Sequence, residues 1–363
     1  MGRFHPPQDD PMKLSHLSPS LLLLLASTAS AQISTTAEFE VRFDATWSSS
    51  THPGAYPNNA HFSPLIGATH DGSIHFWQDG GIATNGMESM AETGSTSALT
   101  SEINAAIAQG RAFERILGAG INSPGSTTRS FTAHQDFPLF TLVTMIAPSP
   151  DWFLGVDSIE LIQNGRWIAT QTIDLYAWDA GTDSGANFNS PNQNTNPQDP
   201  IELMTGGPFF GVTPLGQFTI TRVSGASYCD AKVNSQGCLP TISSNGFASV
   251  SSGSAFEIRA DMVVNSQPGL LFYGYGDAAL PFQDGTLCVS APQRRTPVQN
   301  SGGNPPPLDC SGSYSFDMNA WIQSGVDANL VAGTRVYAQF WSRDPQASFP
   351  TGLTNAIDFL IQP

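Results

Sequence analysis

Short apolar runs separated by polar turns recur along the chain, and this pattern predicts strands rather than long helices. Glu38 to Phe43 alternates polar and apolar side chains and is expected to form the first strand of the mature fold. Phe140 to Ala147 is a continuous apolar run of strand length, bounded by proline, and indicates a central core strand. Phe218 to Val223 is expected to be the strand that closes this half of the chain.

A hairpin is predicted at Asn164-Gly165, which separates the strand-like runs Ser158 to Ile162 and Trp167 to Tyr176. Asn-Gly is typical of two-residue type I′ turns, because both central positions need a positive φ. An antiparallel hairpin returns its two far ends to the same side of a sheet. The segments that precede and follow this hairpin are therefore expected to meet.

A second hairpin is predicted at Asp71-Gly72, between two further strand-like runs. Apolar residues at helical spacing predict one substantial helix in the first half of the chain, from about Ala98 to Gln109. The polar segment Asn187 to Pro200 contains almost no apolar residue and is interpreted as a long surface loop. The runs that flank Asp71-Gly72 are Phe62 to His70 and Ser73 to Trp77.

The second half of the chain has a strand pattern of its own. Gly, Ser, Thr, Asn and Pro are abundant and only 12% of the residues are charged, which favours short strands joined by polar turns. We therefore predict an all-β protein: an antiparallel β-sandwich followed by a second sandwich. The expected divisions are residues 1–31, 32–225 and 226–363. The expected strands of the last division are Phe256 to Val264, Gly269 to Tyr275, Arg335 to Trp341 and Ile357 to Ile361.

The first division, residues 1–31, reads as a secretory signal peptide. Lys13 precedes the short apolar core Leu21 to Leu25, and Ala29 to Ala31 fits a small-residue cleavage site. The apolar run is too short to span a bilayer, so no transmembrane segment is expected. Translation can begin at Met1 or at Met12. The mature protein is expected to be secreted.

The net charge of −16, from 14 basic and 30 acidic residues, predicts a surface that repels phosphate backbones. Nucleic acid is therefore excluded as an expected partner. Anionic lipid would be repelled as well, unless bound calcium reverses the charge locally.

Four cysteines, an even number, all lie in the second half of the chain, which suits disulfide bonds in an exported protein. They are Cys229, Cys238, Cys288 and Cys310. Three pairings are possible. Because short loops close at a lower entropic cost, Cys229–Cys238 with Cys288–Cys310 is the favoured pairing. The sequence contains no Cys-x-x-Cys motif, so a zinc ribbon is not expected.

Candidate chemistry centres on Asp151, Asp179 and Asp183, which lie in Pro- and Gly-rich segments on either side of the Asn164-Gly165 hairpin. If the hairpin brings these carboxylates together, they repel each other unless a cation lies between them. Carboxylate oxygens on flexible loops suit Ca²⁺. The alternative is structural: Asp179 and Asp183 would form Asx turns and Asp151 would cap a loop. Spacing alone leaves both interpretations open.

Other candidate sites are weaker. The four histidines between residues 52 and 75 match no zinc-binding spacing and are better explained as hydrogen-bonded or surface residues. A hydrolase would need two carboxylates in unlike environments, drawn from the three aspartates or from Glu88 and Glu92. Three acids crowded at one end fit an ion better than a split acid and base, so no catalytic residue is proposed. Glu92 is interpreted as a helix-start or supporting acid. The histidines are His52, His61, His70 and His75.

Several motifs, in order, resemble the spondin N-terminal (F-spondin) domain family. They are the segment Trp47 to His70, Asn85-Gly86-Met87 with Ala91-Glu92, PSPDW at residues 148–152, and WDAGTDSG at residues 178–185. The resemblance runs from about Glu38 to about Val223, roughly half the chain. The second half resembles a C-terminal module of secreted bacterial proteins and carries no functional assignment.

The resemblance implies a C2-like β-sandwich that binds calcium through the aspartate of PSPDW and both aspartates of WDAGTD. Those positions are Asp151, Asp179 and Asp183 in this chain. Animal members are secreted matrix-adhesion proteins, which implies a secreted calcium-binding recognition protein with an extracellular protein or glycan ligand. A carbohydrate-binding module is the alternative, motivated by the aromatic content. One exposed tryptophan could then serve as a sugar platform, although the sequence does not select it.

Overall fold

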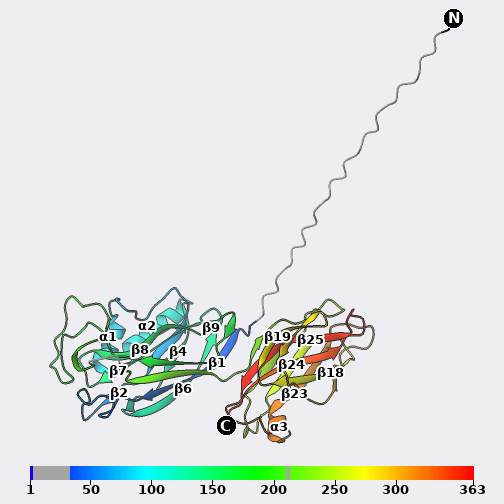
Figure 1. Cartoon of the computed structure of the whole chain (residues 1–363). Helices are drawn as coiled ribbons and strands as arrows, with labels where there is room; N and C mark the ends of the chain where they lie inside the picture. Colours follow the sequence, from blue (N-terminus) through cyan, green and yellow to red (C-terminus); the bar gives the residue numbers. More distant parts are fainter. Residues whose placement is uncertain (3–32, 210–212) are drawn as a thin grey trace. The chain divides into compact units, whose positions relative to one another are not determined.

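The computed structural model describes residues 1–2, 33–209 and 213–363 (Figure 1). Most of the signal-peptide segment proposed from the sequence lies outside these residues. Strands make up 43% of the structure and helices 9%, and the sheets are antiparallel, so the predicted all-β fold class is confirmed. No described helix is long and apolar enough to cross a membrane.

Residues 36–222, called here the first sandwich, place a four-stranded sheet against a larger one. The smaller sheet has the order β11-β14-β1-β6. The expected first and closing strands of this half of the chain, β1 and β14, are adjacent within it and pair from Phe39↔Arg222 to Ala45↔Gly216. The strands are β1 (Thr36–Ala45), β6 (Gly125–His134), β11 (Thr170–Leu175) and β14 (Gly216–Arg222).

The larger sheet follows the order β13-β12-β8-β7-β2-β5, with β3 and β4 joined to it through β7. Its central strand β7 covers the whole apolar run that predicted a core strand. The strands are β2 (His61–Phe62), β3 (Ile66–His70), β4 (Ala112–Leu117), β5 (Ile121–Asn122), β7 (Leu139–Ala147), β8 (Trp152–Glu160), β12 (Trp178–Asp179) and β13 (Glu202–Leu203).

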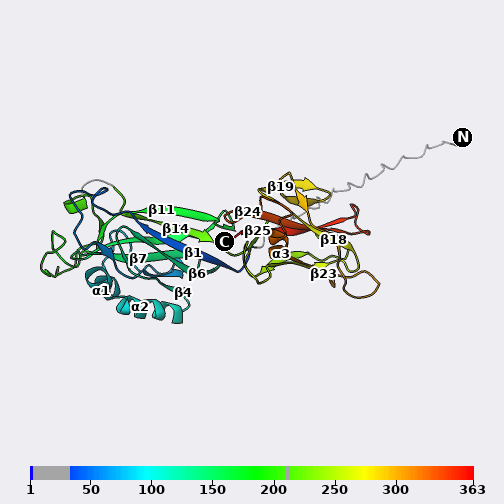
Figure 2. The same ribbon diagram turned by 90° about the horizontal axis from the view of Figure 1, so that it is seen from below.

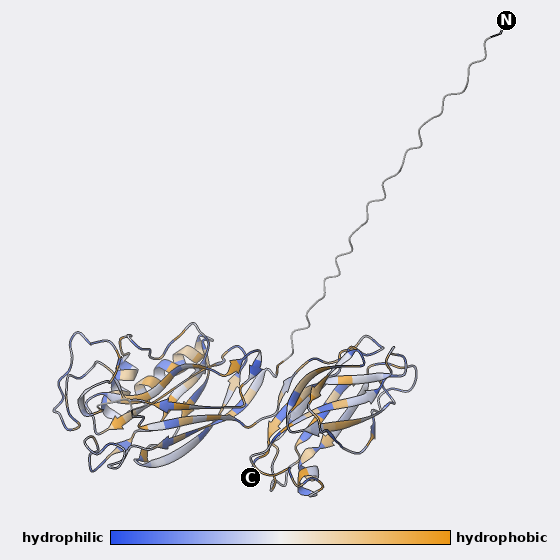
Figure 3. Ribbon diagram, in the orientation of Figure 1, coloured by the Kyte–Doolittle hydropathy of each residue, from blue (hydrophilic) through white to orange (hydrophobic). Residues whose placement is uncertain are grey.

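Strand β7 is buried on both faces, which explains why its sequence is continuously apolar rather than alternating. Phe140, Leu142 and Ile146 face the core between the two sheets. Val143 and Met145 face a second core beneath two helices, which cover the outer face of the larger sheet (Figure 2). Figure 3 shows hydrophobic and hydrophilic residues interspersed along the strands of the molecule.

The two helices are α1 (Asn85–Thr93) and α2 (Ser97–Ala108). The sequence predicted α2 to within a residue at each end. It did not predict α1, although Thr84 caps that helix by accepting a hydrogen bond from the Met87 N–H and Gly94 ends it in the left-handed conformation. A one-turn 3-10 helix, η1 (Gly207–Phe209), lies in the long connection before β14.

The Asn-Gly turn forms as predicted, with φ of 53° at Asn164 and 71° at Gly165. The hairpin around it is much shorter than expected, because only two residues pair on each side. The chain on one side continues from β8 in the larger sheet, and β11 on the other side belongs to the smaller sheet. The turn therefore passes the chain from one sheet to the other. The short strands are β9 (Ile162–Gln163) and β10 (Arg166–Trp167).

The second predicted hairpin is wrong on one side. Strand β3 ends at His70, but residues 73–77 form no strand. Asp71 Oδ1 accepts hydrogen bonds from the N–H and hydroxyl of Ser73, and this local turn replaces the expected ladder. Strand β3 pairs instead with β4 and β7.

Residues 226–361, called here the second sandwich, form a six-stranded sheet, a three-stranded sheet and a separate hairpin. No sheet of the described residues mixes strands from before and after residue 225, although the proposed domain boundaries stay a prediction. The elements are β15 (Ala226–Tyr228), β16 (Thr241–Asn245), β17 (Glu257–Val263), β18 (Pro268–Gly274), β19 (Asp277–Phe282), β20 (Gly285–Val289), β21 (Arg294–Arg295), β22 (Gln299–Asn300), β23 (Gly312–Asp317), α3 (Met318–Gln323), β24 (Arg335–Arg343) and β25 (Thr351–Leu360).

All four cysteines form disulfides, but the favoured pairing is wrong. The bonds are Cys229–Cys288 and Cys238–Cys310, which span 59 and 72 residues instead of closing short loops. Loop-closure entropy grows only with the logarithm of loop length, so the short loops offered an advantage of less than about 2 kcal/mol for each bond. The positions of the strands in the folded sandwich outweigh that difference.

Candidate functional site

Asp151 and Asp179 come together because strand β12 pairs with the beginning of β8. Trp178 lies opposite Phe153, and Asp179 lies opposite Trp152. The Ala180 N–H also donates to the Asp151 carbonyl oxygen. The predicted proximity of the two aspartates is therefore correct, but the predicted reason is not. The Asn-Gly hairpin does not bring them together; instead, β12 brings Asp179 back to β8.

Asp151 has the most constrained carboxylate of this group, with 0% of the residue exposed. Its Oδ2 accepts hydrogen bonds from the Thr182 N–H at 2.7 Å, the Asp183 N–H at 3.0 Å and the Thr182 hydroxyl at 3.2 Å. Its Oδ1 is buried and has no hydrogen-bond partner among the described residues. Burial, followed by the negative charge of Asp179, raises the pKa of Asp151 to about 6.

Asp179 and Asp183 each form the Asx turn that the structural alternative predicted. Asp179 Oδ1 accepts from the Gly181 N–H, and Asp183 Oδ1 accepts from the Gly185 N–H. Asp183 Oδ2 also accepts from the Gln193 N–H, which ties the polar loop to the site. Burial raises the pKa of Asp179. The negative charge of Asp179 acts on Asp151, whereas Asp183 contacts the Asp151 carboxylate through its backbone N–H.

Gly181 permits this arrangement for two reasons. Its φ is 72°, and a Cβ at this position would lie 2.1 Å from the Asp199 carbonyl oxygen. Gly185, unlike Gly181, has no positive φ. A Cβ there would instead lie 2.8 Å from the side chains of Pro150 and Ser190, so that glycine allows close packing.

Glu92 is a fourth acid at this end of the first sandwich, and the sequence argument assigned it only a supporting role. It lies in the last turn of α1, and its Oε1 is buried without a partner among the described residues. Burial raises the pKa of Glu92, and the negative charges of Glu88 and Asp183 act in the same direction. The Ala91-Glu92 motif was the available signal, but α1 itself had not been predicted.

The acidic character extends into a cavity of about 590 Å³ that Asp179 lines together with Asp199 and Glu202. None of the ion pairs among the described residues includes Asp151, Asp179, Asp183 or Glu92. Within the same residues, no three His, Cys, Asp or Glu side chains are grouped so as to hold a metal by themselves. A complete calcium shell would therefore also draw on other oxygen donors, as calcium sites commonly do.

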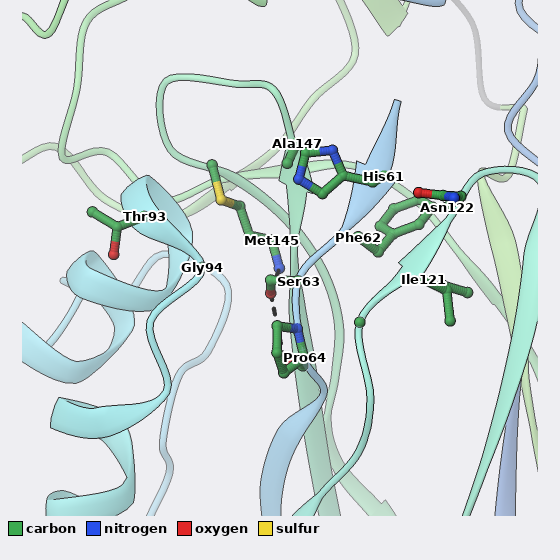
Figure 4. Close-up of a pocket in the computed structure, with 11 residues that line it drawn as sticks. His61, Phe62, Ser63, Pro64, Thr93, Gly94, Ile121, Asn122, Met145 and Ala147 are labelled. Atoms are coloured by element: carbon green, nitrogen blue, oxygen red, sulfur yellow. Dashed lines mark hydrogen bonds between the residues drawn. The ribbon is translucent and has the colours of Figure 1, made fainter. Parts of the chain in front are cut away.

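A second hollow, of about 410 Å³, lies where the end of α1 faces strands β2, β5 and β7. Figure 4 shows Met145 between Thr93 on the helix side and His61 and Asn122 on the strand side. Glu92 precedes Thr93, and Asp151 lies four residues after Ala147, which also lines this hollow. This recess and the acidic site therefore share the same chain segments.

Other candidate residues have structural roles. His70 is buried, with its Nδ1 2.8 Å from the Asp71 carbonyl oxygen and its Nε2 2.8 Å from the Thr141 hydroxyl; burial lowers its pKa. Trp47, Trp152 and Trp167 are all buried, and Trp178 packs edge-on against Trp77. None of these four tryptophans is an exposed platform.

The fold and the site define a class: an antiparallel β-sandwich that gathers buried carboxylates on loops at one end. Residues 37–209 match the family model described as Spondin_N. The first sandwich of this chain belongs to the spondin N-terminal domain family, and the resemblance seen in its motifs is confirmed.

Similar proteins include Spondin-2 of Rattus norvegicus, which is 35% identical over 198 residues, covering 51% of this chain and 60% of that protein. Spondin-2 of Homo sapiens is 36% identical over 174 residues, covering 47% and 53%. Spondin-1 of Mus musculus is 32% identical over 211 residues, covering 52% of this chain and 26% of that protein. The chain thus spans about a quarter to three fifths of these relatives.

Proposed function

We propose that the chain is a secreted recognition protein whose first sandwich binds Ca²⁺ and presents the surrounding loops to an extracellular protein or matrix partner. The observation that carries the proposal is the buried Asp151 Oδ1, which has no partner among the described residues and lies near Asp179, an acid that no described basic side chain pairs with. An isolated buried charge is costly unless it is paired. A divalent cation supplies that pairing.

Asp151, Asp179 and Asp183 would hold the ion, with Glu92 close enough to add to the negative field. Their donor chemistry fits calcium, which accepts carboxylate oxygens and backbone carbonyl oxygens in flexible geometry. Bound calcium would supply the positive charge that lets these acids stay ionised at neutral pH. It would also hold the segments 148–152 and 178–185 against each other.

The same arrangement favours recognition over catalysis. The acids share one crowded environment, whereas a hydrolytic pair needs two carboxylates held in different protonation states. The hollow beside Met145 is a suitable place for a partner group, because its lining segments lead directly into the calcium-binding loops. Family membership supports an adhesion-type role for the first sandwich.

Calcium titration by isothermal calorimetry tests this proposal. The wild-type chain should release heat on calcium binding, and both Asp151→Asn and the double variant Asp179→Asn, Asp183→Asn should lose most of it. Asp136→Asn is the matched control, since it makes the same charge change at an exposed side chain. Equal binding heats in all four proteins would disprove the site.

Partner binding is tested separately, on immobilised extracellular-matrix proteins in calcium and then in chelator. Retention that requires calcium, and that the double aspartate variant lacks, supports the adhesion role. Retention that is equal in calcium and in chelator would leave the calcium site without a part in recognition.

A further inference from the structure

The outer face of the six-stranded sheet in the second sandwich carries an apolar row. Leu270 lies opposite Trp341, and Trp341 lies opposite Leu353, so the three side chains cross strands β18, β24 and β25 on one face. Their neighbours Leu271 and Phe340 point the other way, into the core between the two sheets. The row therefore faces away from that core.

The β19–β20 hairpin forms a wall beside this row. Leu287 of the hairpin packs against the same small cluster as Leu353, and the Cys229–Cys288 disulfide fixes β20. The turn of the hairpin is also held, because Thr351 donates its hydroxyl to Gln283 Oε1 and Lys232 donates to the Gln283 carbonyl oxygen. Together the sheet and hairpin enclose a groove of about 760 Å³.

Two arginines line this groove and stand on opposite sides of the apolar row. Arg295 lies opposite Phe272, one row away in one direction, and Arg343 lies opposite Thr351, one row away in the other. The rows of the two arginines are therefore offset by four residues, or roughly 13 Å, measured along the strand direction. The guanidinium of Arg343 lies 5.3 Å from the centre of the Trp341 ring.

Neither of these arginines belongs to an ion pair among the described residues, whereas six other arginines there pair with aspartates. Arg111, Arg115 and Arg129 also form no ion pair among the described residues, so what distinguishes Arg295 and Arg343 is that both line one groove. They do so in a chain with a net charge of −16, in which acidic residues outnumber basic ones by about two to one. Two unpaired guanidinium groups in one groove favour an anionic occupant. Arginine binds carboxylate and sulfate oxygens through paired, charge-assisted hydrogen bonds.

The groove also indicates what kind of anion it accepts. The main-chain groups of β18 and β24 are paired with each other, so an occupant of the sheet face must be bound by side chains. A peptide would instead seek an open strand edge. The side chains that line the groove include three aromatic rings, two arginines and the amides of Gln283 and Gln293. Such a set can contact the apolar face of a sugar ring and hydrogen-bond its hydroxyl groups.

We propose that this groove binds an acidic oligosaccharide, with Trp341 contacting a sugar ring while Arg295 and Arg343 pair with carboxylate or sulfate groups on either side. The site lies in the second sandwich and does not depend on the calcium site proposed for the first.

The test is a titration of the full chain with an oligouronide, a sulfated oligosaccharide and a neutral oligosaccharide of equal length. The acidic sugars should bind, and the neutral sugar should bind at least about tenfold more weakly. The stronger of the two acidic ligands identifies the charged group. Affinity should fall as salt rises, because both arginines are exposed.

Arg295→Gln and Arg343→Gln should each weaken binding of the acidic sugar by about tenfold. Arg129→Gln is the matched control: it removes the same charge from an exposed arginine of the first sandwich that forms no ion pair there, and it should leave affinity unchanged. Trp341→Phe keeps an aromatic ring and should weaken binding less than Trp341→Ala. Unchanged melting temperatures of the two arginine variants show that the fold is intact.

Three results would overturn the proposal: no binding of either acidic sugar, an affinity loss in Arg129→Gln equal to that in the groove variants, or neutral sugar bound as tightly as acidic sugar. Binding of an acidic peptide that requires Arg295 and Arg343, with no sugar binding, would reassign the groove to a protein partner and would also overturn it.

Discussion

The two sandwiches order their long loops by different means. The first has no cysteine, and its residues 182–193 are held by hydrogen bonds to Asp151 and Asp183, which form no ion pair among the described residues. The second pins its long connections with two disulfides that span 59 and 72 residues. One half of the chain therefore relies on reversible electrostatic pairing, while the other is constrained covalently.

This difference predicts which solution conditions should change the stability of each half. Carboxylates held close together make stability depend on pH and on cations. A covalent link makes it depend on redox conditions instead. Each sandwich should accordingly have perturbations to which the other is indifferent, and the following experiments test that separation.

The largest expected effect is the loss of Cys229–Cys288. A Cys229→Ala, Cys288→Ala double variant should lower the free energy of unfolding of the second sandwich by about 4 kcal/mol, because its unfolded chain regains the freedom of a long loop. Chemical denaturation and, as a separate measurement, scanning calorimetry determine the change. The calcium affinity of the first sandwich should stay at its wild-type value, and a parallel loss there would contradict the separation.

The next effect concerns pH in the absence of calcium. The pKa of Asp151 is about 6 in the folded chain against 3.8 in the unfolded chain, so the folded state holds the proton more tightly. The free energy of unfolding should therefore fall as pH rises from about 4 to about 6, by up to about 3 kcal/mol, and stay low above that window. Denaturation curves across this range measure it.

Asp151→Asn supplies the comparison for that pH dependence. Its amide does not titrate, so the difference in stability between variant and wild type should follow the same window. A wild-type curve parallel to that of Asp151→Asn from pH 4 to pH 7 would remove Asp151 as the source. The second sandwich should show no corresponding step.

Calcium should increase the stability of the first sandwich by about as much as rising pH lowers it. At a free concentration one hundred times the dissociation constant, the ion should stabilise it by about 2.7 kcal/mol. Asp151→Asn should abolish this gain. In chelator, however, the variant should be at least as stable as wild type, because it removes a buried charge that Asp179 repels. Thermal melts with and without calcium measure both outcomes, and a variant destabilised in chelator would contradict the electrostatic account.

The smallest effect concerns the helix that carries Glu92. Thr84→Ala removes the hydroxyl that accepts the Met87 N–H, and it should lower the stability of the first sandwich by about 1 kcal/mol. Thr96→Ala is the matched control, since Thr96 precedes α2 without a side-chain capping bond. Equal losses in the two variants would show that the cap contributes nothing measurable by thermal denaturation.

Local sequence signals predicted the local structure well. The Asn164-Gly165 turn, strand β7 and helix α2 follow from residue type and spacing alone. What failed were inferences that need tertiary information. The chain changes sheets at the Asn-Gly turn, and no local signal distinguishes that from a long hairpin. The disulfide pairing likewise depends on which strands become neighbours, which short-loop entropy does not determine.

The candidate site shows the same division. The sequence predicted that Asp151 and Asp179 lie close together, but β12 pairing with β8 brings them together rather than the Asn-Gly hairpin. The three-aspartate metal site stays a prediction. The position of Glu92 at this end of the sandwich was not foreseen, since it lies on α1, which the sequence did not predict and which packs against the sheet. The groove of the second sandwich was not foreseen, because its row of Leu270, Trp341 and Leu353 exists only once three strands are in register.

Strand β7 has a further consequence for how this fold tolerates insertions. With both faces apolar, a shift by one residue would not expose a hydrophobic surface to water, so polarity alone cannot reject a misaligned strand. Side-chain volume and two threonines must do so instead: Thr141 bonds to His70, and Thr144 donates to the Ser63 carbonyl oxygen. A single residue inserted within this strand would leave it apolar, but every side chain after the insertion would turn from one core toward the other.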